Sequence, residues 1–265
     1  MWRHLLNLYE ESKLNTGTPV CMFKETLIFE EGWLLRSVLR EWKTHPPTSE
    51  LPFLPFPPNA RVYSEGQLFT PFKVRPKSER TGKPKGETNT RIDGIAGDFS
   101  IREGTKAGIK LDPGCEYIAV FEAKLYSPLS KGVTHASDYD QVSRTTACLI
   151  HALLQAGPGP DCQAYVVVLY PEDSPKINRD DYPQSHIEEQ IRKRLADYKN
   201  AGTSTDELQQ FEAEWRGMLD QVKVLFETWE DVLAEIGDER LWEFHGHCKE
   251  FNRRHVRSQQ AQRRE

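Results

Sequence analysis

The feature that most constrains the fold is a pair of apolar, β-rich runs separated by a helical pattern. The runs are EYIAVFEAK at 116–124 and QAYVVVLYP at 163–171, and the helical pattern spans 136–156. Strands that are apolar on both faces are typical of the centre of a parallel sheet, where helices cover each face. A strand, a crossover helix and a second strand form a βαβ unit, so we predict an α/β protein built around residues 116–170.

Apolar periodicity and turn residues predict further elements on both sides of this unit. Upstream we expect a helix within 1–20, a helix at 24–43, a proline-rich loop near 45–59 that packs down, a short helix or strand at 62–72, and a hairpin that starts at 91. Downstream we expect helices at 184–200 and 205–219, a strand at 221–227, a helix after Thr228 and a helix at 238–256. The fold class is therefore α/β, with a mixed sheet of about five strands flanked by helices and extra helices at both ends.

Composition narrows the class of protein further. The 265 residues fit one domain, with a core at about 24–236 and a helical, basic extension at 237–265. No apolar run approaches the length of a membrane span, and the first residues do not fit a secretion signal. The five cysteines are scattered without a CxxC pair, which indicates reduced thiols and a cytoplasmic location. Because the formal net charge is −5, any surface that binds nucleic acid must be local.

Two charged residues stand at the end of the first apolar run. Glu122 and Lys124 are two residues apart in a predicted strand, so their side chains point to the same face. Burying charge costs free energy unless the charge has a partner. An upstream acid, Asp93 or Asp98, is placed to fold back beside them. Two carboxylates and a lysine form a hard-oxygen metal site beside a positive charge, which is chemistry suited to a phosphodiester.

Three motifs in this order resemble those of the PD-(D/E)xK nuclease superfamily, which has the restriction-endonuclease-like fold. They are RIDG at 91–94, the ExK triplet Glu122-Ala123-Lys124 at the end of an apolar strand, and YDQVSR at 139–144, which opens the following helix. The resemblance runs from Glu30 to about residue 236. It implies a Mg²⁺-dependent nuclease that hydrolyses phosphodiester bonds, with Mn²⁺ able to substitute and with DNA favoured over RNA as substrate.

The resemblance also implies roles for individual residues. Glu122 and one upstream aspartate hold the metal, together with the carbonyl of Ala123, and the RIDG context favours Asp93 over Asp98. Lys124 orients the attacking water or stabilises the developing charge.

Two further catalytic contributors are implied by their order in the chain. Gln141, on the helix after ExK, matches a glutamine that enters the active site in several branches of the superfamily. A first-helix glutamate, Glu30 or Glu31, matches one that reaches the metal. An amide bonded only within the fold and glutamates on a solvated helix face are the competing interpretations.

The candidate nucleic-acid contacts are cationic. The segment 73–91 holds seven Lys or Arg against two Glu, among them Lys83, Lys85 and Arg91. It is a candidate phosphate-binding loop or a solvated hairpin tip. Arg144, one turn after Gln141, is a candidate to neutralise a phosphate.

Two other groups of residues carry side chains of the metal-ligating types. Glu87, just before RIDG, is a candidate for a further metal-site acid. The contiguous run His245-Gly246-His247-Cys248 lacks the spacing of a tetrahedral site, and we expect it on a surface helix face.

The alternative function is a catalytically silent member of the same fold that binds nucleic acid or acts as a scaffold. The intact Asp, Glu and Lys favour the enzyme. A homodimer or a complex with a partner protein is compatible with either hypothesis, and neither involves a membrane.

Overall fold

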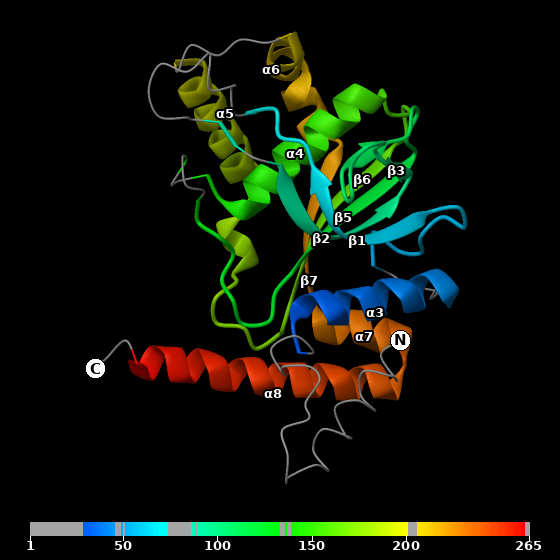
Figure 1. The fold of residues 1–265 in the computed structure, drawn as a ribbon, viewed down its shortest axis with the longest axis vertical. Helices are drawn as coiled ribbons and strands as arrows, with labels where there is room; N and C mark the ends of the chain where they lie inside the picture. Colours follow the sequence, from blue (N-terminus) through cyan, green and yellow to red (C-terminus); the bar gives the residue numbers. More distant parts are fainter. Residues whose placement is uncertain are drawn as a thin grey trace.

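The structure is a computed structural model that describes residues 29–45, 49, 51–73, 86–87, 89–132, 136, 139–200 and 206–262. Within these residues one helix is followed by five strands, and helices then separate the last two strands and end the chain (Figure 1). The strands are β1 (Arg61–Leu68), β2 (Thr90–Gly97), β3 (Phe99–Ile101), β4 (Ile109–Leu111), β5 (Tyr117–Ala123), β6 (Gln163–Tyr170) and β7 (Val222–Thr228). The α-helices are α3 (Glu31–Thr44), α4 (Gln141–Ala156), α5 (Gln184–Asn200), α6 (Asp206–Leu219), α7 (Trp229–Ile236) and α8 (Glu239–Gln262).

A mixed five-stranded sheet forms the centre of the molecule, in the order β1-β2-β5-β6-β7. Strands β1, β2 and β5 pair antiparallel, whereas β5, β6 and β7 pair parallel. The predicted βαβ unit is confirmed, because β5 and β6 are parallel neighbours joined through α4. In the chain segment that connects β2 to β5, strands β3 and β4 form a separate two-stranded hairpin.

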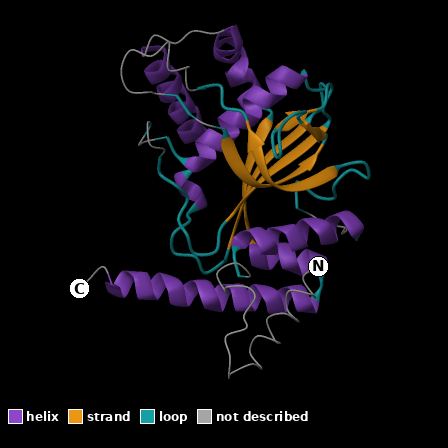
Figure 2. Cartoon of the chain, viewed as in Figure 1, coloured by secondary structure: helices purple, strands orange, loops and turns teal. Residues whose placement is uncertain are grey.

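The sheet lies between two groups of helices (Figures 1 and 2). Helices α4, α5 and α6 cover one face and share a core with side chains such as Val120 of β5 and Val166 of β6. Helices α3, α7 and α8 cover the other face and pack on alternate residues of the same strands, such as Phe121 and Val167. Both faces of β5 and β6 are therefore buried, which explains why their sequences show no polar alternation.

Most predicted elements are confirmed, and the differences concern mainly their bounds. Helix α8 continues to Gln262, past the predicted end at 256, and the hairpin predicted from 91 is instead the sheet strand β2 followed by the hairpin of β3 and β4. The proline-rich loop packs down as expected, with Phe53 and Phe56 buried. The run near 62–72 is a strand and not a helix. Helix α4 begins at Gln141 and not near 136, because the Asp140 carboxylate accepts the Ser143 N–H at 2.9 Å and caps the helix there.

The predicted cap of α7 is confirmed, since Thr228 Oγ1 accepts the Asp231 N–H at 3.0 Å. Helix α3 starts at Glu31, although the prediction began at 24; residues 24–28 lie outside the described residues. The helix expected within 1–20 lies outside them as well. In the described part of the chain, no helix combines the length and apolarity needed to span a bilayer.

Candidate active site

The candidate site lies where β2 and β5 separate. Their antiparallel ladder ends at the pair Gly94↔Phe121, so Asp93 and Glu122 follow directly at the point of divergence. Beyond that pair, the Asp93 side chain forms the contact between the strands, because its Oδ2 accepts the Ala123 N–H at 2.8 Å. The sheet topology therefore brings Asp93 beside the ExK triplet, as the sequence prediction required.

Lys124 joins the two carboxylates. Its Nζ lies 3.7 Å from Asp93 Oδ2 and 3.9 Å from Glu122 Oε2. The lysine side chain is 9% exposed and Glu122 is 1% exposed, whereas Asp93 is 32% exposed. The three charged groups thus form a cluster that is buried at Glu122 and open to solvent at Asp93.

Glu122 is held mainly by neutral donors. Thr145 Oγ1 donates to Glu122 Oε1 at 2.7 Å, and Gln141 Nε2 donates to Glu122 Oε2 at 2.6 Å. Burial and the Asp93 charge raise the pKa of Glu122 to about 7, despite the opposing effects of Lys124, Thr145 and Arg144. The surroundings therefore leave the negative charge of Glu122 only partly compensated.

Gln141 is where the sequence places it, and its orientation is fixed from both sides. As the first residue of α4, it donates to Glu122, while its Oε1 accepts the Ser130 N–H at 3.2 Å. Thr145 was missed by the sequence analysis. It lies four residues after Gln141 on α4, and that i, i+4 spacing is a signal that would have predicted both on one helix face.

Helix α3 brings both candidate first-helix glutamates toward the site. Burial raises the pKa of Glu31 most strongly, and the Lys124 and Asp93 charges also act on this carboxyl. Burial also raises the pKa of Glu30, with Asp93 a smaller contributor. Glu31 therefore interacts with two members of the cluster and Glu30 with one.

Of the predicted phosphate-binding cations, Arg91 and Arg144 lie among the described residues. Arg91 is exposed on β2, two residues from Asp93. Arg144 acts on the Glu122 charge from α4, and its buried Nε has no hydrogen-bond partner among the described residues. Lys83 and Lys85 lie outside the described residues.

Asp98, the alternative metal ligand, lies at the other end of the β2–β5 ladder. Its Oδ2 accepts the N–H groups of Glu116 and Tyr117 at 3.0 and 3.1 Å. These bonds fasten the start of β5, whereas Glu122 lies near its end. The structure therefore places Asp93, and not Asp98, beside Glu122.

Glu87 does not belong to the cluster, contrary to the hypothesis that it is a further metal-site acid. Its Oε1 accepts from Arg194 Nε at 2.6 Å, and its Oε2 accepts from Thr70 Oγ1 at 3.2 Å. Both ends of this ion pair are buried, at 4% and 2% exposure. The Arg194 guanidinium neutralises the charge of Glu87 by direct contact, so this glutamate has a structural role.

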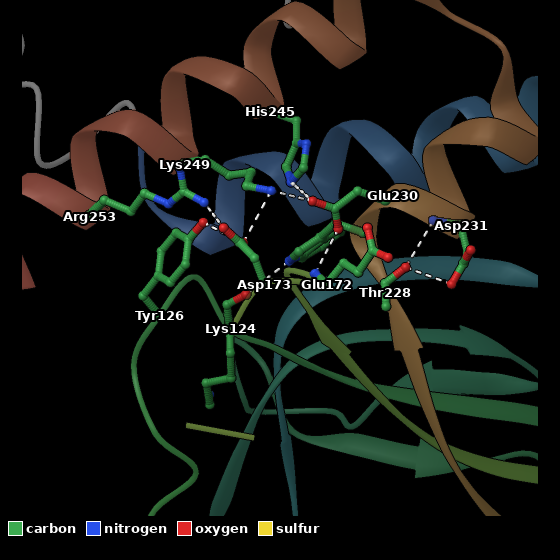
Figure 3. A network of polar contacts seen from close by, with 11 residues as sticks. Lys124, Tyr126, Glu172, Asp173, Thr228, Glu230, Asp231, His245, Lys249 and Arg253 are labelled. Atoms are coloured by element: carbon green, nitrogen blue, oxygen red, sulfur yellow. Dashed lines mark hydrogen bonds and ion pairs between the residues drawn. The ribbon is translucent and has the colours of Figure 1, made fainter. Parts of the chain in front are cut away.

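The C-terminal helices support the backbone of the site (Figure 3). Trp229 Nε1 donates to the Lys124 carbonyl at 2.9 Å, and both groups are buried. Two residues further along, the Tyr126 hydroxyl donates to Asp173 Oδ1 at 2.7 Å, and Lys249 of α8 lies 3.2 Å from the same oxygen. Contacts from α7 and α8 therefore fix the chain on the C-terminal side of ExK.

The expected surface position of the His245–Cys248 run is wrong for its two ends. His245 and Cys248 are buried, at 2% and 0% exposure, because this part of α8 packs against α3 in the core that covers one face of the sheet. Burial lowers the pKa of His245 to about 4, so it is neutral at physiological pH.

A divalent cation fits the donor set of the cluster. Within the described residues, no group of three His, Cys, Asp or Glu side chains could hold a metal ion. The cluster instead offers two carboxylates, those of Asp93 and Glu122. Mg²⁺ is commonly held by one or two carboxylates and keeps several waters. Burial and the Asp93 charge raise the pKa of Glu122, so a cation between the two carboxylates would offset their mutual repulsion, and the exposure of Asp93 gives a route from solvent.

Comparisons of this chain with protein-family models, curated proteins and solved structures return no match.

Proposed function

We propose that this protein is a Mg²⁺-dependent nuclease of the PD-(D/E)xK superfamily, with a restriction-endonuclease-like core and with DNA favoured as substrate. One observation carries the proposal: the Lys124 ammonium lies within 4 Å of both the Asp93 and the Glu122 carboxylate. A buried glutamate and a buried lysine beside a second, partly exposed carboxylate, at the end of a central strand, form a costly arrangement that needs a chemical reason.

Each residue of the cluster has a role in this proposal. Asp93 and Glu122, with the Ala123 carbonyl, hold the cation, and the Ala123 N–H fixes the Asp93 carboxylate. Thr145 and Gln141 fix the Glu122 carboxylate. When bound, Mg²⁺ polarises the phosphate and lowers the pKa of a water nucleophile. Lys124 donates hydrogen bonds to that water or to the charge that develops on the phosphate oxygens.

Further residues would position the substrate and the ligands. Arg91 is exposed beside Asp93, and the Arg144 guanidinium has an unused buried donor, so both are suited to phosphate oxygens. Lys83 and Lys85 remain candidates for the same contact. Glu30 or Glu31 would act through water molecules around the cation, because neither joins Asp93 and Glu122 in a three-carboxylate group.

A cleavage assay with a metal titration tests the proposal. Linear duplex DNA, single-stranded DNA and RNA are incubated with the full chain in EDTA, Mg²⁺ or Mn²⁺. We expect cleavage with either metal, none in EDTA, and none with Lys124→Ala in any condition. Binding without metal-dependent cleavage of any of the three substrates would overturn the enzyme and favour the silent nucleic-acid-binding module.

A further inference from the structure

Two cysteines lie together at the end of the sheet opposite the candidate active site. Cys115 precedes β5 and is 1% exposed, and Cys162 precedes β6 and is partly exposed. The other cysteines in the described part of the chain, Cys148 and Cys248, are fully buried. Only the first pair therefore combines a neighbouring thiol with access to solvent.

Backbone hydrogen bonds hold the two cysteines on adjacent segments, one residue out of register. The Gln163 N–H donates to the Glu116 carbonyl at 2.8 Å, so Cys162 lies beside Glu116, the residue next to Cys115. The Gly159 N–H donates to the Cys115 carbonyl at 3.1 Å, and the Cys162 N–H donates to the Gly159 carbonyl at 3.1 Å. The parallel ladder then begins with the pair Tyr117↔Gln163. Neighbouring strands are about 4.7–4.9 Å apart. The offset of one residue adds about 3.3 Å along the strand, so the two Cα atoms lie roughly 6 Å apart, within the Cα separation of about 4.4–6.8 Å that a disulfide requires.

The side chains already interact. A hydrogen bond joins the two thiols, and it lowers the pKa of Cys162 while raising the pKa of Cys115. The Cys115 thiol donates to the Tyr117 carbonyl at 3.6 Å and is buried, whereas Cys162 is partly exposed and is the thiol that ionises more readily. Burial of Cys162 and the nearby Asp98 and Glu116 carboxylates oppose this ionisation. The thiolate is the reactive form of cysteine, so Cys162 is the thiol that would react first.

We propose that Cys115 and Cys162 are a peroxide-reactive thiol pair that forms a reversible disulfide across the start of β5 and β6. In the first step the Cys162 thiolate attacks one oxygen of hydrogen peroxide, giving Cys162 sulfenic acid and hydroxide. The Cys115 sulfur then attacks the sulfenic sulfur, the S–S bond forms and water leaves. In total, two thiols and one peroxide give one disulfide and two waters, and a dithiol reverses the reaction.

The disulfide is expected to stabilise the fold without changing the site. It closes a long loop that contains β5 and α4, which restricts the unfolded chain. The seven residues of β5 separate it from Glu122 and Lys124 by roughly 20 Å, at about 3.3 Å per residue. The proposal is therefore independent of the nuclease hypothesis, and its readouts are chemical and thermal.

The test uses the reduced full chain, treated with a small excess of hydrogen peroxide and then alkylated. Non-reducing peptide mass spectrometry is expected to find a Cys115–Cys162 linked peptide, lighter by two hydrogens than its reduced parts. The melting temperature should rise by several degrees and return with dithiothreitol. Cys115→Ser should instead leave a Cys162 sulfenic acid that dimedone traps.

Cys248→Ala serves as the matched control and should form the same linked peptide as the wild-type protein. Over-oxidation of Cys162 to sulfinic acid without a link to Cys115 would overturn the proposal. A linked peptide that joins other cysteines would overturn it as well. The wild-type peptide map decides the question even if a variant fails to fold.

Discussion

Glu87 and Glu122 are both buried glutamates, and their surroundings differ in kind. Glu87 has a guanidinium 2.6 Å away and a threonine hydroxyl on its second oxygen. Glu122 has a threonine hydroxyl and an amide as direct partners, a lysine at 3.9 Å and a second carboxylate nearby. The charge of Glu87 is therefore neutralised within the protein by direct contact, whereas the charge of Glu122 is only partly compensated.

This difference separates a structural acid from a candidate catalytic one. A buried ion pair with direct contact is stable as it stands, although removal of one partner is costly. An acid whose pKa rises to about 7 instead retains affinity for a proton or for a metal cation. Burial alone therefore does not identify a functional carboxylate. A charged partner in direct contact indicates a structural role, whereas neutral partners leave the carboxylate able to bind a cation.

The largest expected effect is on catalysis, in Lys124→Ala. Turnover should fall by about 10³-fold or more, which is about 4 kcal/mol, because the variant loses the donor for the developing charge. The unfolding free energy should change far less, since Glu122 can take up a proton when the ammonium is gone. Cleavage rates and urea denaturation of the same preparation check both statements. Wild-type turnover in this variant would remove Lys124 from the mechanism.

The next effect is on stability, in Arg194→Met. This change strands Glu87 as a buried charge and should lower the unfolding free energy by about 3 kcal/mol or more. Arg192→Met is the matched control: it lies on the same helix in an exposed pair with Glu189, so its loss should be within about 0.5 kcal/mol. The double change Glu87→Met and Arg194→Met should recover much of the stability. Equal stabilities of Arg194→Met and Arg192→Met would erase the contrast between the two glutamates.

A third effect is the pH dependence of stability in metal-free protein. The folded pKa of Glu122 is about 7, above its ordinary value of 4.5, so the folded state binds more protons than the unfolded state between these values. Stability from this group is therefore lost as the pH rises from about 4.5 to about 7, by about 3 kcal/mol in total. Wild type should lose stability over this range relative to Glu122→Gln, and excess Mg²⁺ should reduce the loss. Parallel curves for the two proteins in EDTA would contradict the assignment.

The smallest effect compares the two aspartates of β2. Asp93→Asn should reduce turnover by about 10²-fold, because a charged ligand of the cation is lost. Asp98→Asn should keep near-wild-type turnover and lose about 1 kcal/mol of stability, since its carboxylate accepts two backbone N–H groups at the far end of the β2–β5 ladder. Initial rates and thermal melts measure both. Equal losses of turnover, or the reverse order, would move the ligand to Asp98.

Much of the fold was predictable because local signals and tertiary packing agree. The apolar runs of β5 and β6 and the helical pattern between them fix the βαβ unit from sequence alone. The start of α4 was placed too early, because the apolar pattern continues upstream of the residue that caps the helix. The capping acid, Asp140, is identified only by its bond to Ser143.

The site was predictable where residues are close in sequence and less so where partners are remote. The shared face of Glu122 and Lys124 follows from strand alternation, whereas Asp93 is preferred over Asp98 only through the resemblance of the RIDG motif, and the antiparallel pairing of β2 with β5 explains its position. The partner of Glu87, Arg194, is 107 residues away, so the sequence could not reveal that this acid is already paired. Trp229, 105 residues from Lys124, is unpredictable for the same reason.

The central claim is that the Asp93 and Glu122 carboxylates form one cation site. A crystal of the protein soaked in Mn²⁺ and measured for anomalous scattering tests it directly. The account predicts a peak about 2.0–2.5 Å from a carboxylate oxygen of each residue, and no peak at this position in crystals of Glu122→Gln. A peak at Asp98 or Glu87, or none between Asp93 and Glu122 at saturating Mn²⁺, would contradict it.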